Sequence, residues 1–412
     1  MSKKLQVLLL SSSMLVVVFA LIGGLGVHAS SSSSNADSSY THMQVYSEVL
    51  HRIRTEYVEE PNMGAVTNGA LHGLLESLDA DSSYLSPAEY KAYQASKTDA
   101  KAGVGAVVSK RFGYAAVVSV TPGGPADKAG INAGDIFETV NGKSTHDLSL
   151  AAIRTQLLGD PGSRLEVVLI RARKVEPQKL TIVREVVNPP AVQAQMMPEN
   201  VGYIKAQALT KGKAQDIATK IKELQSKGAK KLVLDLRNNA DGDEDEGIAV
   251  ANLFLNKGMI SYLQGQKYPK ATFSADPQKK ITDLPLAVIV NRSTAGAAEI
   301  IASALLDNSR ADVVGEKTFG EGSVQKVLDV PDGSALILSV AKYYTPKDKI
   351  IQDTGVTPNV LVAGGLEDVT AVTDDDSEVA PDEPQQSKPQ QKQDDDQLKK
   401  AIDVVNRKTQ KS

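Results

Sequence analysis

The sequence predicts a multidomain α/β protein, because three regions of the chain carry different residue patterns. Residues 41–98 repeat apolar side chains at three- and four-residue spacing, which is typical of amphipathic helices. Residues 99–187 contain short β-branched runs punctuated by glycine, as small β domains do. Residues 188–365 alternate strand-like and helix-like segments, which indicates βαβ units around a largely parallel sheet.

The N-terminus carries the features of an export signal. Lys3 and Lys4 precede an uncharged stretch, residues 5–27, and Val-His-Ala at 27–29 resembles a small-residue cleavage site. Because the stretch is also long enough to span a bilayer, residues 1–29 are either a cleaved signal peptide or a retained membrane anchor. Both alternatives predict an extracytoplasmic protein, in the periplasm or cell envelope, membrane-anchored or secreted. A polar linker is expected at 30–40.

Composition excludes several classes of function. The 412 residues include 46 Lys plus Arg against 50 Asp plus Glu, so the chain lacks the basic excess that nucleic-acid binding requires. There is no Cys, which rules out disulfides and thiolate chemistry. The five His do not show metal-ligand spacing. No cofactor or metal is therefore expected.

The elements follow in order along the chain. Val45, Val49 and Ile53 lie on one helical stripe, a second helix is expected at 66–78, and Pro87 after Ser86 marks the start of a third. For the middle region we expect strands at 115–120, 136–140, 165–170 and 180–183, with a helix at 151–158. For the third region we expect helices at 211–225, 247–255 and 295–306, and strands at 231–236 and 284–290.

The last part of the chain has a different composition. Residues 366–394 are rich in Asp, Glu, Gln and Pro and cannot bury enough apolar surface to fold, so we expect a disordered linker. Residues 395–412 predict a short helix that Asp396 caps, with Leu398, Ile402 and Val405 on one face. We favour a solvated tail with an apolar end over a dedicated partner helix.

The middle region resembles a PDZ domain. The motifs are Gly103-Val104-Gly105-Ala106, Gly124-Pro125-Ala126-Asp127-Lys128-Ala129-Gly130-Ile131, Gly134-Asp135 and Val140-Asn141-Gly142. In that fold a glycine-rich loop presents backbone N–H groups to a peptide's terminal carboxylate, and the peptide adds as a strand to a sheet edge. The resemblance implies a peptide-binding loop of Gly103, Val104, Gly105 and Ala106, with Val104 and Ala106 as its apolar floor. A β domain that no longer binds peptide is the alternative.

The flanks resemble the C-terminal processing (tail-specific) serine peptidases, and the likeness covers residues 41–363 in order. The motifs are Leu78-Asp79-Ala80-Asp81-Ser82-Ser83-Tyr84-Leu85, Val201-Gly202-Tyr203-Ile204, Leu234-Asp235-Leu236-Arg237-Asn238-Asn239, Gly315-Glu316-Lys317-Thr318-Phe319-Gly320, Gly322-Ser323-Val324-Gln325 and Ala341-Lys342-Tyr343-Tyr344-Thr345-Pro346. The resemblance implies a helical N-terminal domain at 41–98, a PDZ domain (a β sandwich or barrel with helices) at 99–187, and a ClpP/crotonase-like α/β peptidase core at 188–365.

The same resemblance implies that the catalytic positions are altered. These peptidases use a Ser nucleophile and a Lys base, and a desolvated Lys can accept the hydroxyl proton. Alignment on Glu299 places the nucleophile position at Gly296, and alignment on Phe319 and Gly320 places the base position at Glu321. The family's interval of 25 residues is kept, so the two anchors agree. The family's Gln is retained as Gln325.

The oxyanion site is the third change that the resemblance implies. Where the family has Asn-Asn-Pro-Gly-Gly, this chain has Asn238-Asn239-Ala240-Asp241-Gly242, and Asp241, Gly242 and Ala297 are the candidate oxyanion residues. A carboxylate at Asp241 would oppose a developing negative charge, and losing one oxyanion donor typically costs ~10²–10³ in rate. The acidic run 241–246 departs from a calcium loop in its Gly and Glu positions, so we expect it to decorate a helix N-terminus.

Three functional readings follow. The first is an exported pseudopeptidase that binds polypeptide C-terminal tails through its PDZ domain and groove without cutting them. The second is an active serine-type endopeptidase with relocated residues, for which Ser293 or Thr294 with Lys317 is the candidate pair, or a water that Glu321 activates beside Gly296. The third is a structural envelope protein. Membrane anchoring through 5–27 and homo-oligomerisation stay open.

Overall fold

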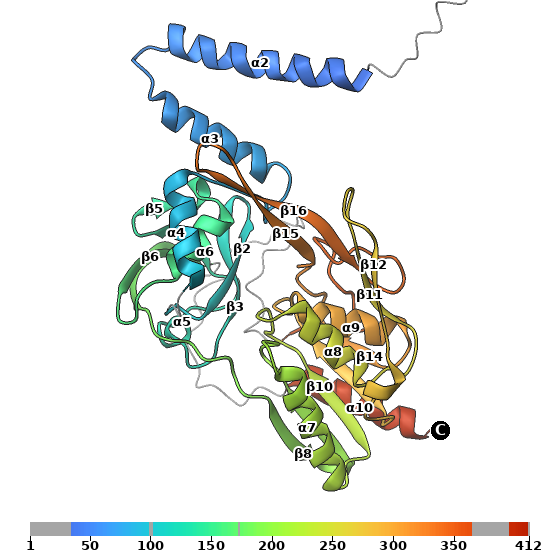
Figure 1. Ribbon diagram of the computed structural model, residues 1–412. Coiled ribbons are helices and arrows are strands. Elements are labelled where there is room, and N and C mark those ends of the chain that lie inside the picture. The colour runs from blue at the N-terminus through green and yellow to red at the C-terminus, as the bar shows by residue number, and fades with distance from the viewer. Residues whose placement is uncertain (1–33, 99–101, 172–173, 365–394, 411–412) are drawn as a thin grey trace, which may run out of the picture. The chain divides into compact units, whose positions relative to one another are not determined.

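The computed structural model describes residues 34–98, 102–171, 174–364 and 395–410 (Figure 1). The chain divides after Thr67 into two units, which are described separately. The first unit contains helix α2 (Ser34–Glu56) and the start of α3 (Met63–Glu76). The export segment 1–29 lies outside the described residues. Of the linker expected at 30–40, residues 30–33 also lie outside the described residues, and the remainder belongs to α2, which begins at Ser34.

The second unit begins with the end of α3 and then the PDZ domain. A short strand β1 (Ser83–Leu85) and helix α4 (Pro87–Thr98) precede a sheet of order β2-β3-β4-β6-β7, with β5 beside β4. Its elements are β2 (Ala106–Arg111), β3 (Tyr114–Val120), α5 (Pro125–Lys128), β4 (Ile136–Val140), β5 (Lys143–Ser144), α6 (Leu150–Leu157), β6 (Arg164–Arg171) and β7 (Lys174–Val183). Strand β2 lies at one edge of this sheet, so a peptide strand has an edge to join.

The core is built on a six-stranded sheet of order β17-β14-β13-β10-β9-β8. All neighbouring pairs are parallel except β8 with β9, so the largely parallel sheet expected from the sequence is present. Its strands are β8 (Gln193–Met197), β9 (Val201–Lys205), β10 (Lys231–Asp235), β13 (Leu286–Val290), β14 (Asp312–Gly315) and β17 (Val360–Leu361). The helices α7 (Lys213–Ser226), α8 (Glu244–Asn252) and α9 (Ala297–Asp307) contribute to the core that covers it.

A second, antiparallel sheet was not expected from the sequence. Its order is β1-β16-β11-β12, with β15 beside β16. Its remaining strands are β11 (Met259–Gln264), β12 (Ala271–Ser274), β15 (Ser323–Asp329) and β16 (Ala335–Tyr344). Because β1 pairs with β16, the motif at 78–85 is tied to the core although about 250 residues separate the two strands.

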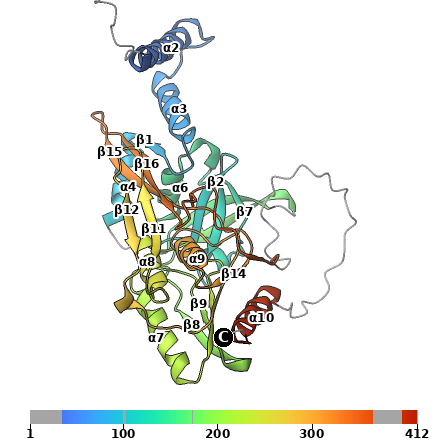
Figure 2. The same cartoon turned by 90° about the vertical axis from the view of Figure 1, so that its right-hand side faces the viewer.

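The C-terminal helix corrects another expectation. Helix α10 (Asp396–Gln410) packs on the face of the parallel sheet, against β10, β13 and β14 (Figure 2), and is not a solvated tail. Ala401 and Val405 are fully buried there. Its N-cap is Asp395 rather than Asp396, since the Leu398 N–H donates to Asp395 Oδ1 at 2.9 Å. Within the described ranges, no helix combines the length and apolarity needed to cross a membrane.

Candidate functional site

Three loops at the carboxyl ends of β10, β13 and β14 meet at the candidate site. The Ala295 N–H donates to the Asn239 carbonyl at 2.8 Å, which joins the second loop to the first. The Phe319 N–H donates to the Thr294 carbonyl at 3.0 Å, which joins the third loop to the second. Loops at the carboxyl edge of a parallel sheet are where α/β proteins place ligand-binding groups. The fold therefore gathers 236–242, 291–297 and 316–321 in one place.

Glu299, fully buried on α9, brings Gly296 and Glu321 together. One carboxylate oxygen, Oε2, accepts the N–H of Gly296 at 3.1 Å and the N–H of Glu321 at 2.8 Å. The other oxygen accepts the Gly320 N–H at 2.8 Å and the Thr318 hydroxyl. Burial raises the pKa of Glu299 to about 8, although the four hydrogen-bond donors favour the ionised carboxylate and act to lower the pKa. The two positions that the sequence assigned to nucleophile and base are thus neighbours around one side chain.

Gly296 has a backbone that few other residues adopt. It precedes the first residue of α9 with φ 59° and ψ −122°, a conformation that is strained for L residues. A Cβ placed there would meet no atom within 4 Å. The position has room for a side chain, and only its torsion angles oppose one. Such a turn from strand to helix is where several hydrolases hold a nucleophile, but glycine supplies no reacting atom.

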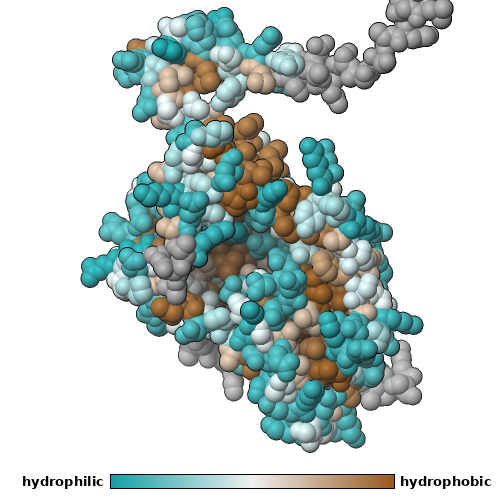
Figure 3. Space-filling model, in the orientation of Figure 1, coloured by the Kyte–Doolittle hydropathy of each residue, from teal (hydrophilic) through white to brown (hydrophobic). Residues whose placement is uncertain are grey.

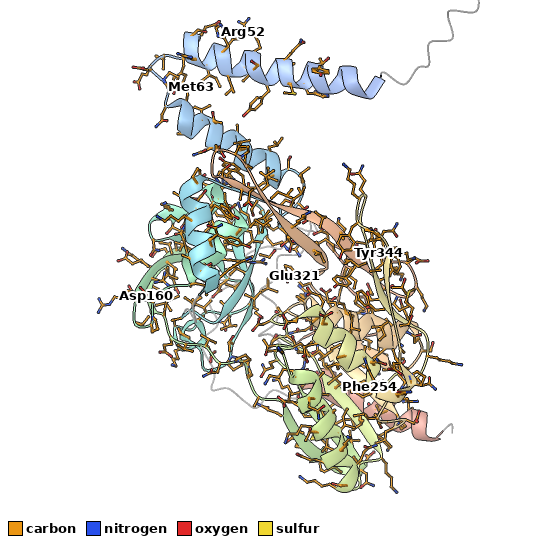
Figure 4. The ribbon with its side chains drawn as sticks, viewed as in Figure 1. Arg52, Met63, Asp160, Phe254, Glu321 and Tyr344 are labelled. Atoms are coloured by element: carbon orange, nitrogen blue, oxygen red, sulfur yellow. The ribbon has the colours of Figure 1, made fainter. Side chains whose placement is uncertain are left out.

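Glu321 lies between the PDZ strands and the core (Figure 4) and contacts an arginine of the PDZ domain. Its Oε1 is 3.3 Å from Nη2 of Arg154 on α6, and the same nitrogen is 3.9 Å from Oδ1 of Asp81. Burial raises the pKa of Glu321, and the charges of Asp81 and Glu244 raise it further, while Arg154 lowers it. Burial likewise raises the pKa of Asp81. The Arg154 guanidinium therefore lies within ion-pair distance of two poorly solvated carboxyl groups.

The candidate oxyanion residues lie on two of the three loops. The Asp241 carbonyl accepts the Leu209 N–H at 2.7 Å, and the Leu209 carbonyl accepts the Asp243 N–H at 3.0 Å. These bonds hold the backbone of Gly242 so close that a Cβ there would lie 2.6 Å from Leu209, so this position requires glycine. Ala297 is the first residue of α9 and is buried. Burial and Asp243 raise the pKa of Asp241, which reflects a poorly solvated carboxyl group.

Gln325 and the acidic run occupy separate places. Gln325, on β15, donates to the Ser323 hydroxyl at 2.7 Å, and Ser323 in turn donates to Asp81 at 3.2 Å. Ser323 therefore links Gln325 to Asp81 at the site. The last three acids of the run, residues 244–246, form the first turn of α8, so the run decorates a helix N-terminus as expected. Glu246 accepts the N–H groups of Gly212 and Ala214 at the start of α7. The described residues hold no group of three acidic or His side chains suited to a metal ion.

The glycine-rich PDZ loop precedes the edge strand β2. Gly103 exchanges backbone hydrogen bonds with Glu185 at 2.9 and 3.2 Å, and the Gly105 carbonyl accepts from Thr121 at 2.8 Å. The Val104 side chain is 2% exposed and belongs to the PDZ core, so of the expected apolar floor only Ala106 stays partly accessible. The loop is fixed in place before any peptide arrives, which lowers the entropic cost of binding.

Arg154 also contacts the edge where a peptide would add. Its Nε and Nη2 donate to the Val108 carbonyl of β2 at 3.3 and 3.1 Å. A peptide strand pairing with β2 would compete for that edge. Sequence reasoning missed Arg154 and Asp81, because nothing in a helix of a PDZ domain signals a contact 167 residues further along the chain.

The alternative nucleophile pair does not meet. Ser293 is 7% exposed and its N–H donates to Asn291 Oδ1 at 3.2 Å, while Lys317 is exposed. Both residues line the same cleft, yet the described contacts include none between them. The Thr294 hydroxyl is buried and donates to the Leu236 carbonyl at 2.9 Å. Within the part of the chain that the structure describes, neither hydroxyl is paired with the base that a Ser–Lys mechanism needs.

Comparison with known proteins agrees with the fold. The family model described as Peptidase family S41 matches residues 200–362, and a PDZ domain model matches 117–171. The carboxy-terminal-processing protease of Bartonella bacilliformis is 33% identical over 335 residues, which are 80% of this chain and 77% of that protein. The carboxy-terminal processing protease CtpA of Bacillus subtilis is 32% identical over 342 residues, 82% of this chain and 72% of that protein.

Among solved structures, the photosystem II D1 C-terminal processing protease superposes with a TM-score of 0.64 at 28% identity. The match covers 78% of this chain and 92% of that one. The fold expected from the sequence, with helices, a PDZ domain and an α/β peptidase core, is therefore confirmed. The chain belongs to the C-terminal processing protease family, within peptidase family S41.

Proposed function

We propose that this chain is a pseudopeptidase: it binds the C-terminal tails of other polypeptides and does not cleave them. The observation that carries the proposal is the shared hydrogen-bond acceptor of Gly296 and Glu321, Oε2 of Glu299. It supports the sequence register that assigns these positions to nucleophile and base. A PDZ domain, and relatives named as C-terminal processing proteases, support a polypeptide C-terminus as ligand.

The chemistry supports inactivity at each step of acyl transfer. Attack on a peptide carbonyl needs a hydroxyl or thiol, and glycine at 296 has neither. Proton removal needs a base, and Glu321 is occupied by the Arg154 guanidinium at 3.3 Å. An oxyanion needs donors without nearby negative charge, and Asp241 adds a carboxyl group to that loop.

The alternatives give different results with a fluorophosphonate probe, which labels activated serines. The proposal expects no labelling of the full chain at any serine, including Ser293. Labelling would instead support the active endopeptidase with relocated residues. A structural envelope protein would show neither labelling nor binding of any peptide with a free apolar C-terminus across a library.

Restoring the missing groups tests the register itself. Gly296→Ser combined with Glu321→Lys should give trace hydrolysis of a tail peptide, since Glu299 still fixes both backbone positions. Adding Asp241→Gly should increase that rate, because it removes a carboxylate from the oxyanion loop. The single variant Gly296→Ser is the matched control and should stay inactive. Equal inactivity of the triple variant would contradict the assigned register.

We also propose export to the periplasm or cell envelope through residues 1–29. The charged start, the apolar run and the small-residue end support this assignment. Cell fractionation combined with mass spectrometry of the mature N-terminus distinguishes a cleaved signal from a retained anchor. Recovery of the intact chain in the cytosol would contradict both.

A further inference from the structure

The N-terminal end of helix α10 contacts the loop 236–242 of the candidate site directly. The two carboxylate oxygens of Asp395 accept from Nη1 and Nη2 of Arg237 at 2.9 and 2.7 Å, although 158 residues separate the two in sequence. The Gln397 side chain accepts a further bond from Arg237 Nη1 at 3.3 Å. A bidentate pair of arginine and carboxylate fixes geometry as well as adding stability. Helix α10 therefore holds one particular residue of the site.

Arg237 is held from its other side by the sheet. Asp235, fully buried at the end of β10, accepts from Nε of the Arg237 guanidinium at 3.0 Å and from Nη2 at 2.6 Å. The same carboxylate accepts the backbone N–H of Arg237 at 3.0 Å and the Tyr203 hydroxyl at 2.7 Å. Because the Arg237 side chain is 16% exposed, water does not fully replace a lost carboxylate partner. The position of Arg237 thus depends on Asp235 and Asp395 together.

The residue after Arg237 carries this constraint to the next loop. Asn238 has a φ of 57°, in the left-handed region. Its N–H donates to Asn291 Oδ1 at 3.0 Å, and its Oδ1 accepts from Asn291 Nδ2 at 2.7 Å. Asn291 begins the loop 291–297, which contains Gly296. A continuous run of contacts therefore connects α10 with the loop of the nucleophile position.

Helix α10 also supports one wall of a cleft. This cleft of ≈ 830 Å³ lies between the PDZ domain and the carboxyl edge of the parallel sheet, where the space-filling view shows a hollowed surface (Figure 3). Its core side includes Asn238, Glu316, Leu361 and Val362. Gln397 Nε2 donates to the Val362 carbonyl at 3.1 Å, so α10 holds the segment after β17 as well as the loop after β10. No described residue of α10 lines the cleft, so the helix supports this wall from outside.

The other end of α10 is anchored away from the site. Asn406 accepts from Lys231 Nζ at 2.7 Å and donates to Glu199 Oε2 at 2.6 Å. Lys231 is the first residue of β10, so this anchor lies at the opposite edge of the sheet. Apolar side chains between the two ends bury the middle of the helix. The helix therefore has two separate polar anchors, and only the one at Asp395 touches the site.

We propose that Asp395 and Arg237 are positioning residues, through which the docked helix α10 fixes the loop 236–242 and the core-side wall of the cleft. When α10 is released, Arg237 loses the acceptors that the helix supplies, and the backbone at Asn238 gains freedom. The C-terminal helix thereby controls the site without touching its ligand. The effect on the loop is independent of the proposed function, whereas the effect on a bound polypeptide tail rests on it.

Hydrogen–deuterium exchange of the full chain tests the effect on the loop. Asp395→Asn removes the charge and keeps a side chain that caps helices well, so α10 stays folded. Amide exchange in 236–242 should be at least ~5-fold faster than in wild type, which is the low end of coupling between sites. Asn406→Ala is the matched control, since it removes the anchor at the far end of the same helix, and it should leave this exchange unchanged. Wild-type rates in Asp395→Asn, or equal acceleration in both variants, would overturn the proposal.

Peptide binding tests the effect on the ligand. Strand β2 has six residues, so it accommodates a peptide of about six residues with a free apolar C-terminus, whereas one of about twelve extends beyond this edge. In fluorescence anisotropy, Asp395→Asn should weaken binding of the longer peptide ~5-fold and leave the shorter one unchanged, and Asn406→Ala should change neither. Equal affinities of wild type and Asp395→Asn for the longer peptide would overturn control of the site by α10. Failure of wild type to bind either peptide would overturn the proposed function, while the exchange rates would still decide whether α10 positions the loop.

Discussion

Replacement of Arg154 by Met tests its two roles together, since Met keeps an unbranched apolar stem and removes the charge and the donors of the guanidinium. In the folded chain the guanidinium holds the Val108 carbonyl on the PDZ edge, and it lies within ion-pair distance of Glu321 and Asp81. Arg154→Met should therefore weaken the fold and, at the same time, strengthen peptide binding. Arg154→Lys is the matched control, because it keeps the positive charge but loses the forked geometry.

The two magnitudes follow from exposure. The Arg154 side chain is 42% exposed, so its bond to Val108 is worth only ~1 kcal/mol, and freeing that carbonyl should lower the peptide Kd about fivefold. Asp81 and Glu321 are 7% and 27% exposed, and losing their shared cation should cost ~1–2 kcal/mol of unfolding free energy at neutral pH. Because burial raises the pKa of both acids, protonation removes this deficit as pH falls through their folded values.

The assays are urea unfolding at neutral and acidic pH and anisotropy with an apolar-ended peptide of about six residues. The expected pattern is lower stability that recovers in acid, combined with tighter binding. An unchanged or weaker affinity in Arg154→Met would refute the competition between Arg154 and a peptide strand. A deficit that persists unchanged in acid would refute the account of Asp81 and Glu321.

Three further changes test single features of the fold. Gly296→Ala should lower the unfolding free energy by ~1–3 kcal/mol, because the positive φ of Gly296 is strained for alanine. Gly69→Ala in helix α3 should be neutral or stabilising, and equal effects of the two substitutions in denaturant unfolding would contradict this backbone strain. Burial alone would raise the pKa of Glu89, but His72 at 3.6 Å and two hydrogen bonds from Ser86 lower it from 4.5 to about 2. Wild type should therefore lose ~1–3 kcal/mol of unfolding free energy as pH falls from 4.5 to 2, and Glu89→Gln should not. Val405→Asp places a charge at a fully buried position and should release α10 to limited proteolysis, whereas Arg407→Asp at an exposed position should not.

Much of the architecture follows from local pattern. The helix over 213–226 and the buried strand 231–235 carry periodicities that only one kind of element satisfies, and their positions differ from expectation by one or two residues. The antiparallel sheet could not be predicted, because the whole PDZ domain separates β1 from β16 in the sequence. Neither strand carries a pattern that indicates which strand it pairs with. The docking of α10 was missed for a related reason. An amphipathic stripe shows that a helix has an apolar face, but not what covers it.

The candidate site likewise contains some residues that the sequence could indicate and others that it could not. Gly296 and Glu321 could be proposed from the sequence as the nucleophile and base positions, because Glu299 and Phe319 lie near them and keep the spacing of the peptidases that the chain resembles. Arg154 could not, because it comes from another domain and acts on Glu321 only through the tertiary fold. The cleft at Glu316 and Leu361 is likewise formed by segments from both domains.

Glu299→Gln tests whether the side chain that holds the backbone of Gly296 and Glu321 is a neutral or an ionised carboxyl group. Four donors favour the anion, while complete burial raises the pKa from 4.5 to about 8. A folded pKa above the unfolded one makes wild type most stable in acid, with a loss of up to ~5 kcal/mol as pH rises from 4.5 to 8. Gln cannot ionise, so the variant should lack this slope and its deficit relative to wild type should shrink toward pH 8. Parallel unfolding curves over that range would mean that the four donors keep Glu299 ionised, and that Gly296 and Glu321 are held by a charge.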